Sequence, residues 1–264
     1  MAIRPKSPEA IEKMRQAGRT VARVLERLEA MARPGVATGE LDAEAARLAH
    51  AEGAKCLFLG QPHPRGRRRY PGNICVSLNE ELVHGIPGPR RIAEGDVVSI
   101  DFGVEQAGWC ADAARTFAVG RVPPRVERLL EVTAEALQVV CREAQAGVLW
   151  SAVAGRIEAL VRGAGFSVVT DYVGHGIGRK MWEEPKVPNF VSRDLLKNDW
   201  LLVEGMTVAV EPMVNLGGRE VREKEDGWTV VTCDGQPSAH FEDTFVIRRD
   251  GAEPLTRLAE PEKG

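Results

Sequence analysis

The chain has 264 residues, of which 44% are hydrophobic, and a formal charge of −3 at pH 7. This length can bury a large core, whereas the small net charge gives no reason to expect sequence-specific nucleic-acid binding. No apolar run approaches the roughly 20 residues of a membrane span, and the start lacks the apolar stretch of a signal peptide, so we expect no membrane contact. The five scattered cysteines form no CxxC, which fits a reducing cytoplasm. We expect one domain over 1–264.

Two helices are expected at the start of the chain. Ser7-Pro8 can cap and begin a helix. Apolar residues then recur at helical spacing and predict one buried face, until Arg33-Pro34-Gly35 ends the helix. A second helix is expected from about Thr38 to Glu52, where Gly53 stops it.

Strands follow, and the pattern then repeats. Residues 97–104 and 108–119 predict two strands joined by a short turn, and Pro123-Pro124 opens the next helix. The remaining expected elements are helices over about 124–146 and 151–163 and strands over 166–171, 206–214 and 241–248. Two helices followed by strands therefore occur twice. This indicates two related halves with a site between them, although the halves share no obvious residue repeat.

Five potential metal ligands stand in short, distinctive contexts. They are Asp101, Asp112, His175, Glu211 and Glu242. Four carboxylates and one imidazole, mostly on apolar strands, are costly to bury unless cations neutralise them. A set rich in carboxylate oxygen suits Mn(II), Fe(II) or Co(II) better than a thiolate-type zinc site, and two metals sharing carboxylates can generate hydroxide and polarise a carbonyl. The alternative interpretation is that the four acids and the histidine are separate surface residues.

Strand alternation supports the metal interpretation. Asp101 faces away from its apolar neighbour Ile100, because successive side chains point to opposite faces. Asp112 lies on the returning strand, so both carboxylates can point into one cleft. Glu242 is expected on a late strand, with His240 on the same face two residues earlier.

The contexts of these residues resemble those of the type I methionine aminopeptidases. The resemblance covers about residues 5–250 and rests on NICVSLNEELVHGIPG, the DFG and ADAARTF pair, GHGIGR, EGMTVAVEPM, DGWTVVT and FEDT. It implies an α/β (α+β) pita-bread fold, with two pseudo-symmetric halves and a curved, mostly antiparallel sheet covered by helices. It also implies an enzyme that removes the initiator Met from nascent proteins with two divalent cations (Co, Mn, Fe(II) or Zn). We expect this enzyme to be a cytoplasmic monomer.

The resemblance assigns metal-binding roles residue by residue. Asp101 and Asp112 would bind one metal. Asp112, His175, Glu211 and Glu242 would bind the other, with Asp112 and Glu242 bridging the two. Glu211 would also serve as general base or proton shuttle.

Further residues match positions that contact the substrate. His84, in VHGIP, matches a substrate-contacting catalytic histidine. Tyr70, Cys75 and Trp228 match positions that line the pocket for the Met side chain, and Met181 neighbours that pocket.

The chain departs from the family pattern at Trp182, where a second active-site histidine is usual. That histidine is expected to hydrogen-bond the substrate and stabilise charge on the scissile carbonyl. Indole offers only an N–H donor and no acid that titrates near neutrality. Met181 likewise replaces a rigid ring with a flexible side chain. We therefore expect altered or weakened catalysis, unless Trp182 is simply packed in the core.

A second departure is the stretch 61–70, which is longer than the family loop and begins with Gln61 where a pocket Tyr is usual. It contains four arginines: Arg65, Arg67, Arg68 and Arg69. They form either a solvated loop or a contact to ribosomal RNA or an acidic peptide. His63 in this loop and His50 on the second helix are expected to be exposed and inert.

Three smaller departures surround the expected ligands. Ala113 stands where Thr commonly follows the metal-binding Asp, His240 where Gln is usual, and Asp243 where His is usual. His240 could be a hydrogen-bond partner of Glu242 just outside the ligands, or a catalytic group.

Two rival functions differ in class from the main one. The first is a related metallopeptidase of different specificity, such as a proline-linked one, against which the absence of an added N-terminal domain argues. The second is a catalytically impaired pita-bread domain that binds peptide or ribosome. Trp182 and the basic loop favour this second rival, whereas the intact metal residues argue against it.

Overall fold

The computed structural model describes residues 5–63 and 68–258. The helices are α1 (Pro8–Met31), α2 (Thr38–Ala51), α3 (Pro124–Glu143), α4 (Trp150–Gly163) and α5 (Arg193–Lys197). The strands are β1 (Lys55–Cys56), β2 (Cys75–Leu78), β3 (Glu81–Val83), β4 (Val97–Gln106), β5 (Trp109–Ala118), β6 (Ser167–Val168), β7 (Gly174–Gly176), β8 (Glu183–Val187), β9 (Thr207–Val210), β10 (Met213–Asn215), β11 (Val221–Glu223), β12 (Val230–Thr232), β13 (Ser238–His240), β14 (Asp243–Ile247) and β15 (Ala252–Pro254).

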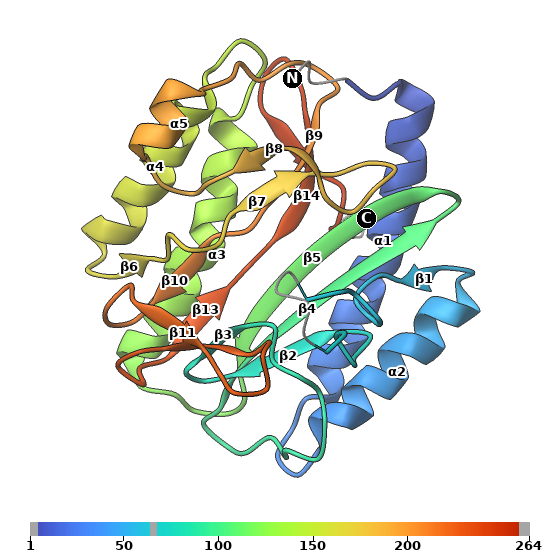
Figure 1. Ribbon diagram of the computed structural model, residues 1–264, viewed down its shortest axis with the longest axis vertical. Helices are drawn as coiled ribbons and strands as arrows, with labels where there is room; N and C mark the ends of the chain where they lie inside the picture. The colour runs from blue at the N-terminus through green and yellow to red at the C-terminus, as the bar shows by residue number, and fades with distance from the viewer. Residues whose placement is uncertain (1–4, 64–67, 259–264) are drawn as a thin grey trace, which may run out of the picture.

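The helices lie in two pairs on either side of the central strands. Figure 1 shows α1 and α2 on the right and α3 and α4 on the left. The strands pair in the orders β1-β4-β2 with β5 on β4, β13-β10-β6, β11-β12-β3 and β15-β14-β9-β7-β8. Every pair in these sheets is antiparallel. Among the described residues, no helix combines the length and apolar character needed to cross a membrane.

Helix α1 forms as its sequence predicts. The Ser7 hydroxyl accepts a hydrogen bond from the backbone N–H of Ala10, and Pro8 occupies the first turn. Its apolar face is buried and packs on β4 and β5. This face includes Ile11, Met14, Val21, Leu25 and Leu28. Because the same amphipathic design recurs in α3 and α4, each half has a buried core of its own.

The long hairpin of β4 and β5 confirms the predicted pair of strands and carries two of the predicted ligands. Its turn uses Ala107 and Gly108, both with positive φ, as a two-residue hairpin turn requires. Asp112 pairs with Gly103, and Asp101 pairs with Ala114. Both acids therefore lie on one face of the hairpin. A Cβ on Gly103 would meet Asp112 Oδ1 at 2.9 Å, so the glycine leaves room for that carboxylate.

Three predicted strands are shorter than expected, and two of them end beside a predicted ligand. The strand expected over 206–214 divides into β9 and β10 at Glu211-Pro212, because proline has no N–H to donate to a ladder. The strand expected over 241–248 begins only at Asp243, so the prediction that Glu242 lies within a strand is wrong. The strand expected over 166–171 keeps only Ser167–Val168.

Candidate active site

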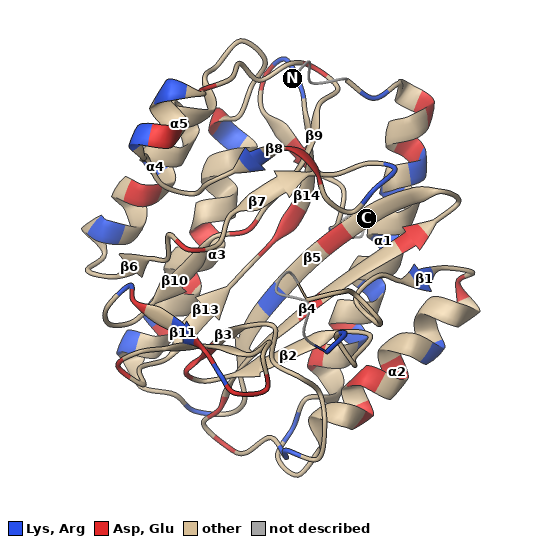
Figure 2. Ribbon diagram, in the orientation of Figure 1, with Lys and Arg blue, Asp and Glu red and all other residues tan. Residues whose placement is uncertain are grey.

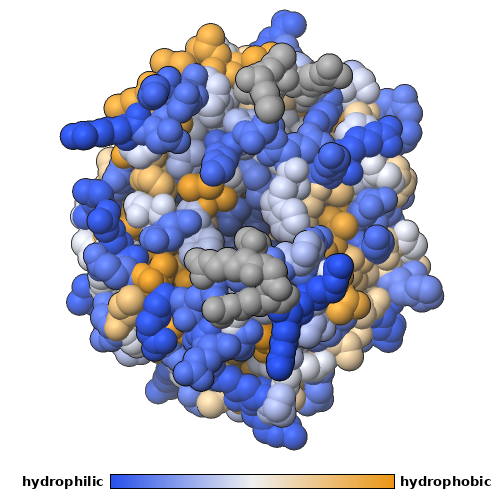
Figure 3. All heavy atoms as spheres, in the orientation of Figure 1, coloured by the Kyte–Doolittle hydropathy of each residue, from blue (hydrophilic) through white to orange (hydrophobic). Residues whose placement is uncertain are grey.

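A cavity of about 710 Å³ lies between the two halves. The space-filling view shows this face of the molecule hollowed near its middle (Figure 3). Every predicted site residue except His240 lines the cavity: Tyr70, Cys75, His84, Asp101, Asp112, His175, Met181, Trp182, Glu211, Trp228 and Glu242. The structure therefore brings together residues from several motifs that are far apart in the sequence.

The floor of the cavity, which we define as Asp101, Asp112, His175, Glu211 and Glu242, holds a compact group of potential metal ligands. Asp112, His175 and Glu242 each place one ligand atom within 4.8 Å of the others. Backbone pairing sets their positions, since Glu242 forms a β-bridge with Ala114 of β5. Figure 2 shows acidic segments on β5 and beside β14, near the middle of the molecule.

Three buried oxygens of this floor have no hydrogen-bond partner among the described residues. They are Asp101 Oδ1, Asp112 Oδ1 and Glu242 Oε1. A buried polar atom left unpaired costs about 1–3 kcal/mol, and more when it is charged. Carboxylate oxygens with an imidazole nitrogen beside them are suitable ligands for divalent transition-metal cations. The residues present therefore fit a divalent metal centre.

Burial raises the pKa of all four acids of the floor. The pKa of Asp112 rises to about 7 because burial disfavours its charged form. Burial, followed by the negative charge of Asp112, likewise raises the pKa values of Asp101, Glu211 and Glu242. A bound cation would reverse this tendency, since it favours the ionised carboxylates.

His175 is prepared to act as a neutral ligand. Burial lowers its pKa. Its Nδ1 lies 2.9 Å from the backbone oxygen of Gly176. A tautomer that donates from Nδ1 leaves Nε2 free to face the cavity, where it lies 3.9 Å from Glu211 Oε1.

His84 occupies the cavity wall in a strained backbone conformation. Its φ is +58°, a left-handed value that non-glycine residues rarely adopt outside sites where the surroundings enforce it. The next residue must be Gly85, since a Cβ there would meet the Val76 oxygen at 2.2 Å. Burial lowers the pKa of His84 to about 4, so its imidazole is neutral at pH 7.

The residues predicted to receive a Met side chain form one apolar wall. The rings of Tyr70 and Trp228 meet edge to face at 5.1 Å. The Tyr70 hydroxyl lies 2.8 Å from the Gly85 oxygen, and the Trp228 indole N–H donates to the Arg68 oxygen at 2.9 Å. Cys75 stands opposite Asp101 in the β2–β4 register, which joins this wall to the floor.

Trp182 lies at the rim of the cavity, and its side chain is not packed in the core. It is 54% exposed, and its ring centre lies 6.4 Å from that of His175. The adjacent Glu183 is held by the ammonium group of Lys6 at 2.6 Å and by the backbone N–H of Lys180 at 3.2 Å. The indole therefore projects into the cavity mouth from an anchored turn.

His63 is buried, so the prediction that it is exposed and inert is wrong, whereas His50 is exposed as expected. The His63 ring contacts Trp228 edge to face at 4.9 Å, and its Nε2 lies 3.4 Å from Glu223 Oε2. These aromatic and ionic neighbours bury it, although it lies on a polar loop. Loop position alone was therefore a poor guide to exposure.

Further cavity residues were missed from the sequence. They include Phe58, Tyr172, Lys186 and Glu223. No short motif marks them, since each reaches the cavity only through the fold. In the longer loop, Arg68 and Arg69 are exposed, whereas Arg65 and Arg67 lie outside the described residues.

His240 is buried behind the floor. Its Nε2 lies 3.7 Å from Glu211 Oε2 and has no hydrogen-bond partner among the described residues. The predicted hydrogen bond from His240 to Glu242 is therefore not formed. Burial lowers the pKa of His240 to about 3, so the side chain is neutral at pH 7.

Known proteins resemble this chain over nearly its whole length. The model of metallopeptidase family M24 matches residues 12–249. Methionine aminopeptidase 1 of Bacillus subtilis is 42% identical over 253 residues, which cover 96% of this chain and 98% of that protein. The methionine aminopeptidase of Escherichia coli is 42% identical over 261 residues, covering 97% and 94%.

Solved structures agree with the sequence relatives. The methionine aminopeptidase of Thermotoga maritima superposes with a TM-score of 0.91 at 39% identity, over 97% of this chain and all of that one. The Xaa-Pro dipeptidase of Bacillus anthracis superposes with a TM-score of 0.75 at 22% identity, over 97% of this chain and 63% of that one, a likeness of fold alone. The predicted pita-bread α/β fold is thus confirmed. The chain belongs to metallopeptidase family M24 and, within that family, to the methionine aminopeptidases.

Proposed function

We propose that this protein removes the N-terminal Met from nascent proteins and peptides. The observation that carries the proposal is the group of Asp112, His175 and Glu242, whose ligand atoms lie within 4.8 Å of one another at the floor of the cavity. Asp101 and Glu211 line the same cavity and complete a ligand set for two divalent cations (Mn, Co, Fe(II) or Zn). The relatives of this chain carry the name of the same activity.

Each group of the chain has a distinct part in the reaction. Divalent cations held at the floor would provide a nucleophile at neutral pH and polarise the scissile carbonyl. Glu211 would accept and return the proton, since its carboxylate lies in the cavity beside two imidazoles. His84, neutral at pH 7, would hydrogen-bond the substrate backbone from the wall.

The apolar wall would select the first side chain. One hydrophobic cluster contains Tyr70, Cys75, Met181 and Trp228. The unbranched thioether side chain of a substrate Met would make apolar contacts with this cluster. The side chain of Met181 is 7% exposed and closes the wall beside the floor.

The identity of Trp182 predicts a slower chemical step than a histidine would give. The indole has one N–H donor and cannot exchange a proton near neutrality. Its side chain is 54% exposed, and among the described residues its indole N–H donates no hydrogen bond. We therefore propose an active enzyme with reduced turnover of ordinary Met-Ala substrates.

The longer loop is proposed to affect partner choice. Gln61, Pro62 and His63 line the cavity, so the loop borders the substrate entrance. The exposed Arg68 and Arg69 would favour an acidic peptide or ribosomal RNA through an electrostatic field that salt screens.

We also propose a cytoplasmic location and a monomeric state for the protein.

Peptide turnover tests the function directly. Met-Ala-Ser, Met-Pro and Xaa-Pro peptides should be compared with Mn(II), Co(II) or Fe(II) added to metal-free protein. The proposal expects cleavage of Met-Ala-Ser that depends on the metal, with little cleavage of Xaa-Pro peptides. Preferred cleavage of Xaa-Pro would indicate a proline-linked peptidase, and metal binding without any cleavage would indicate a binding protein.

A further inference from the structure

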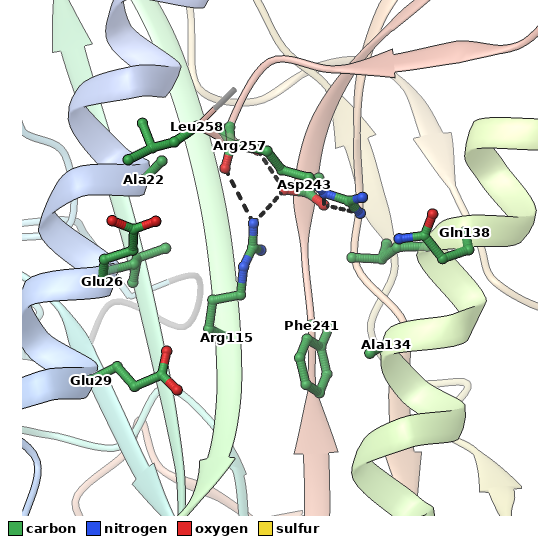
Figure 4. A pocket seen from close by; sticks show the side chains of 13 residues that line it. Ala22, Glu26, Glu29, Arg115, Ala134, Gln138, Phe241, Asp243, Arg257 and Leu258 are labelled. Atoms are coloured by element: carbon green, nitrogen blue, oxygen red, sulfur yellow. Dashed lines mark hydrogen bonds and ion pairs between the residues drawn. The ribbon is translucent and has the colours of Figure 1, made fainter. Parts of the chain in front are cut away.

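Two adjacent carboxylates, Glu242 and Asp243, have opposite surroundings. Glu242 faces the large cavity with Oε1 unpaired among the described residues. Asp243 is fully buried and lines a second, smaller cavity of about 390 Å³. Figure 4 shows this second cavity between the helix that carries Glu26 and the helix that carries Gln138, with Asp243 at its centre.

Asp243 is bound by two cations and a hydroxyl. Arg115 Nη2 donates to its Oδ1 at 2.7 Å, and Arg257 Nε donates to its Oδ2 at 2.8 Å. The Thr256 hydroxyl also donates to Oδ1 at 2.7 Å. A buried acid with partners of this strength holds them in a fixed geometry, because each bond is charge-assisted or buried.

Arg115 reaches beyond Asp243 to the backbone of the metal centre. Its Nη1 donates to the Glu242 oxygen at 2.6 Å and to the Ala114 oxygen at 2.9 Å. Ala114 and Glu242 also exchange backbone hydrogen bonds of 3.2 and 3.0 Å. Since Glu242 lies in the break between β13 and β14, this isolated bridge and Arg115 are what hold its backbone against β5.

The backbone of Asp112 is tied to the same network. The Thr244 hydroxyl donates to the Asp112 oxygen at 2.9 Å and accepts from the Asp112 N–H at 3.0 Å. The backbone N–H of Thr244 donates to the Thr256 hydroxyl at 3.1 Å, and that hydroxyl contacts Asp243. The backbones that carry the Asp112 and Glu242 carboxylates are therefore linked through one buried cluster.

We propose that Arg115, oriented by Asp243, is a positioning residue that sets the distance between the Asp112 and Glu242 carboxylates and thereby the metal affinity of the site. This inference rests on the proposed metal-dependent function. The guanidinium of Arg115 is hydrogen-bonded to no predicted ligand side chain and reaches the metal ligands through the backbone oxygen of Glu242 and the backbone bridge at Ala114. Loss of a partner that orients a ligand typically weakens metal binding by about 10- to 100-fold.

Two arginine variants test the proposal as a matched pair. Arg115→Ala and Arg257→Ala each remove a guanidinium from Asp243, but only Arg115 contacts the Glu242 oxygen. Co(II) affinity should be measured by calorimetry, together with the visible absorption spectrum of bound Co(II). We expect Arg115→Ala to weaken Co(II) binding by about tenfold or more and to change the spectrum. Arg257→Ala should stay within about twofold of the unchanged protein.

A third variant controls for the general cost of breaking a buried ion pair. Glu81 has a side chain only 7% exposed and is paired with Arg90 and Lys224. Glu81→Gln should lower thermal stability and leave Co(II) affinity unchanged. If Arg115→Ala does not fold, Arg115→Lys, which keeps the charge but loses the fork of donors, is measured instead and should weaken Co(II) binding more than Arg257→Ala does.

The outcomes separate this proposal from the proposed function. Equal effects of Arg115→Ala and Arg257→Ala on Co(II) binding, or no effect of either, would overturn the positioning role. Normal Co(II) binding without cleavage of any Met peptide would overturn the proposed function alone. An unchanged protein that binds no Co(II) would overturn both.

Discussion

Most of the floor of the large cavity lies in paired strands, since Asp101, Asp112 and His175 belong to β4, β5 and β7, whereas the rim is made of turns and loops. Asp112 lies in the middle of β5, where every residue from Trp109 to Ala118 pairs with β4. Trp182 and His63 instead project from a turn and from the longer loop. Paired strands fix side-chain direction, so the floor keeps its geometry while the rim can change its side chains. The departures at Gln61 and Trp182 are both at the rim.

The two regions also differ in how their polar groups are paired. At the floor, Asp101, Asp112 and Glu242 each keep a buried oxygen without a partner among the described residues. At the rim, Glu183 is paired with Lys6, and the Trp228 N–H is bonded to the Arg68 oxygen. Unpaired buried acids indicate where cations bind, whereas paired groups indicate where the chain holds its own shape.

The largest effect is expected from removing a floor carboxylate. Asp112→Ala should remove the carboxylate shared by both cations and lower turnover of Met-Ala-Ser by more than about 100-fold, beyond the loss typical of a residue that only orients a ligand. Metal content and steady-state rates would be measured on dialysed protein. Full activity of metal-free Asp112→Ala protein would contradict the proposal that the floor binds the cations needed for turnover.

The floor should also make metal binding depend on pH. The pKa of Asp112 is about 7 in the folded, metal-free protein against an ordinary 3.8. Because this pKa is raised, the metal-free fold is favoured at low pH and loses that stability as pH rises from about 4 to 7. The pKa values of Asp101, Glu211 and Glu242 are raised as well, so a cation must displace at least one proton, and affinity for Mn(II) should rise by about tenfold or more per pH unit below 7. Calorimetric titrations from pH 5.5 to 8 measure this, and a flat profile would refute it.

At the rim, Trp182→His should increase activity. A donor that stabilises negative charge on the scissile carbonyl is worth about 10²–10³ in rate, and we expect at least about tenfold in kcat for Met-Ala peptides. Both proteins are compared at matched metal occupancy. If the unchanged protein already cleaves Met-Ala peptides at about 10 s⁻¹, and Trp182→His leaves kcat unchanged or lower, then Trp182 does not slow catalysis.

The smallest effect is expected from the arginines of the loop. Replacing the four arginines of residues 61–70 with Ser should weaken binding of long or ribosome-bound substrates by a few-fold at low salt, because salt screens the field of exposed charges such as Arg68 and Arg69. Tripeptide cleavage should change less. An equal change for both substrate lengths would show that the loop does not contribute to partner recognition.

The sequence predicted the floor better than the rim for a physical reason. Strand alternation and the β4–β5 pattern place Asp101 and Asp112 on one face without any tertiary information. Local pattern could not place Glu242 in a strand break, since its position depends on a bridge to Ala114. The burial of His63 against Trp228 likewise depends on a contact 165 positions away along the chain (228 − 63). The sequence of the loop alone does not predict this contact.

The most direct test of the account is the location of bound cations in crystals of the protein soaked with Co(II), by anomalous scattering. We expect two peaks at the cavity floor, both in contact with the Asp112 and Glu242 carboxylates, with His175 bound to one of them. Peaks elsewhere in the molecule, or an empty floor at saturating Co(II), would contradict the two-metal site and with it the proposed reaction.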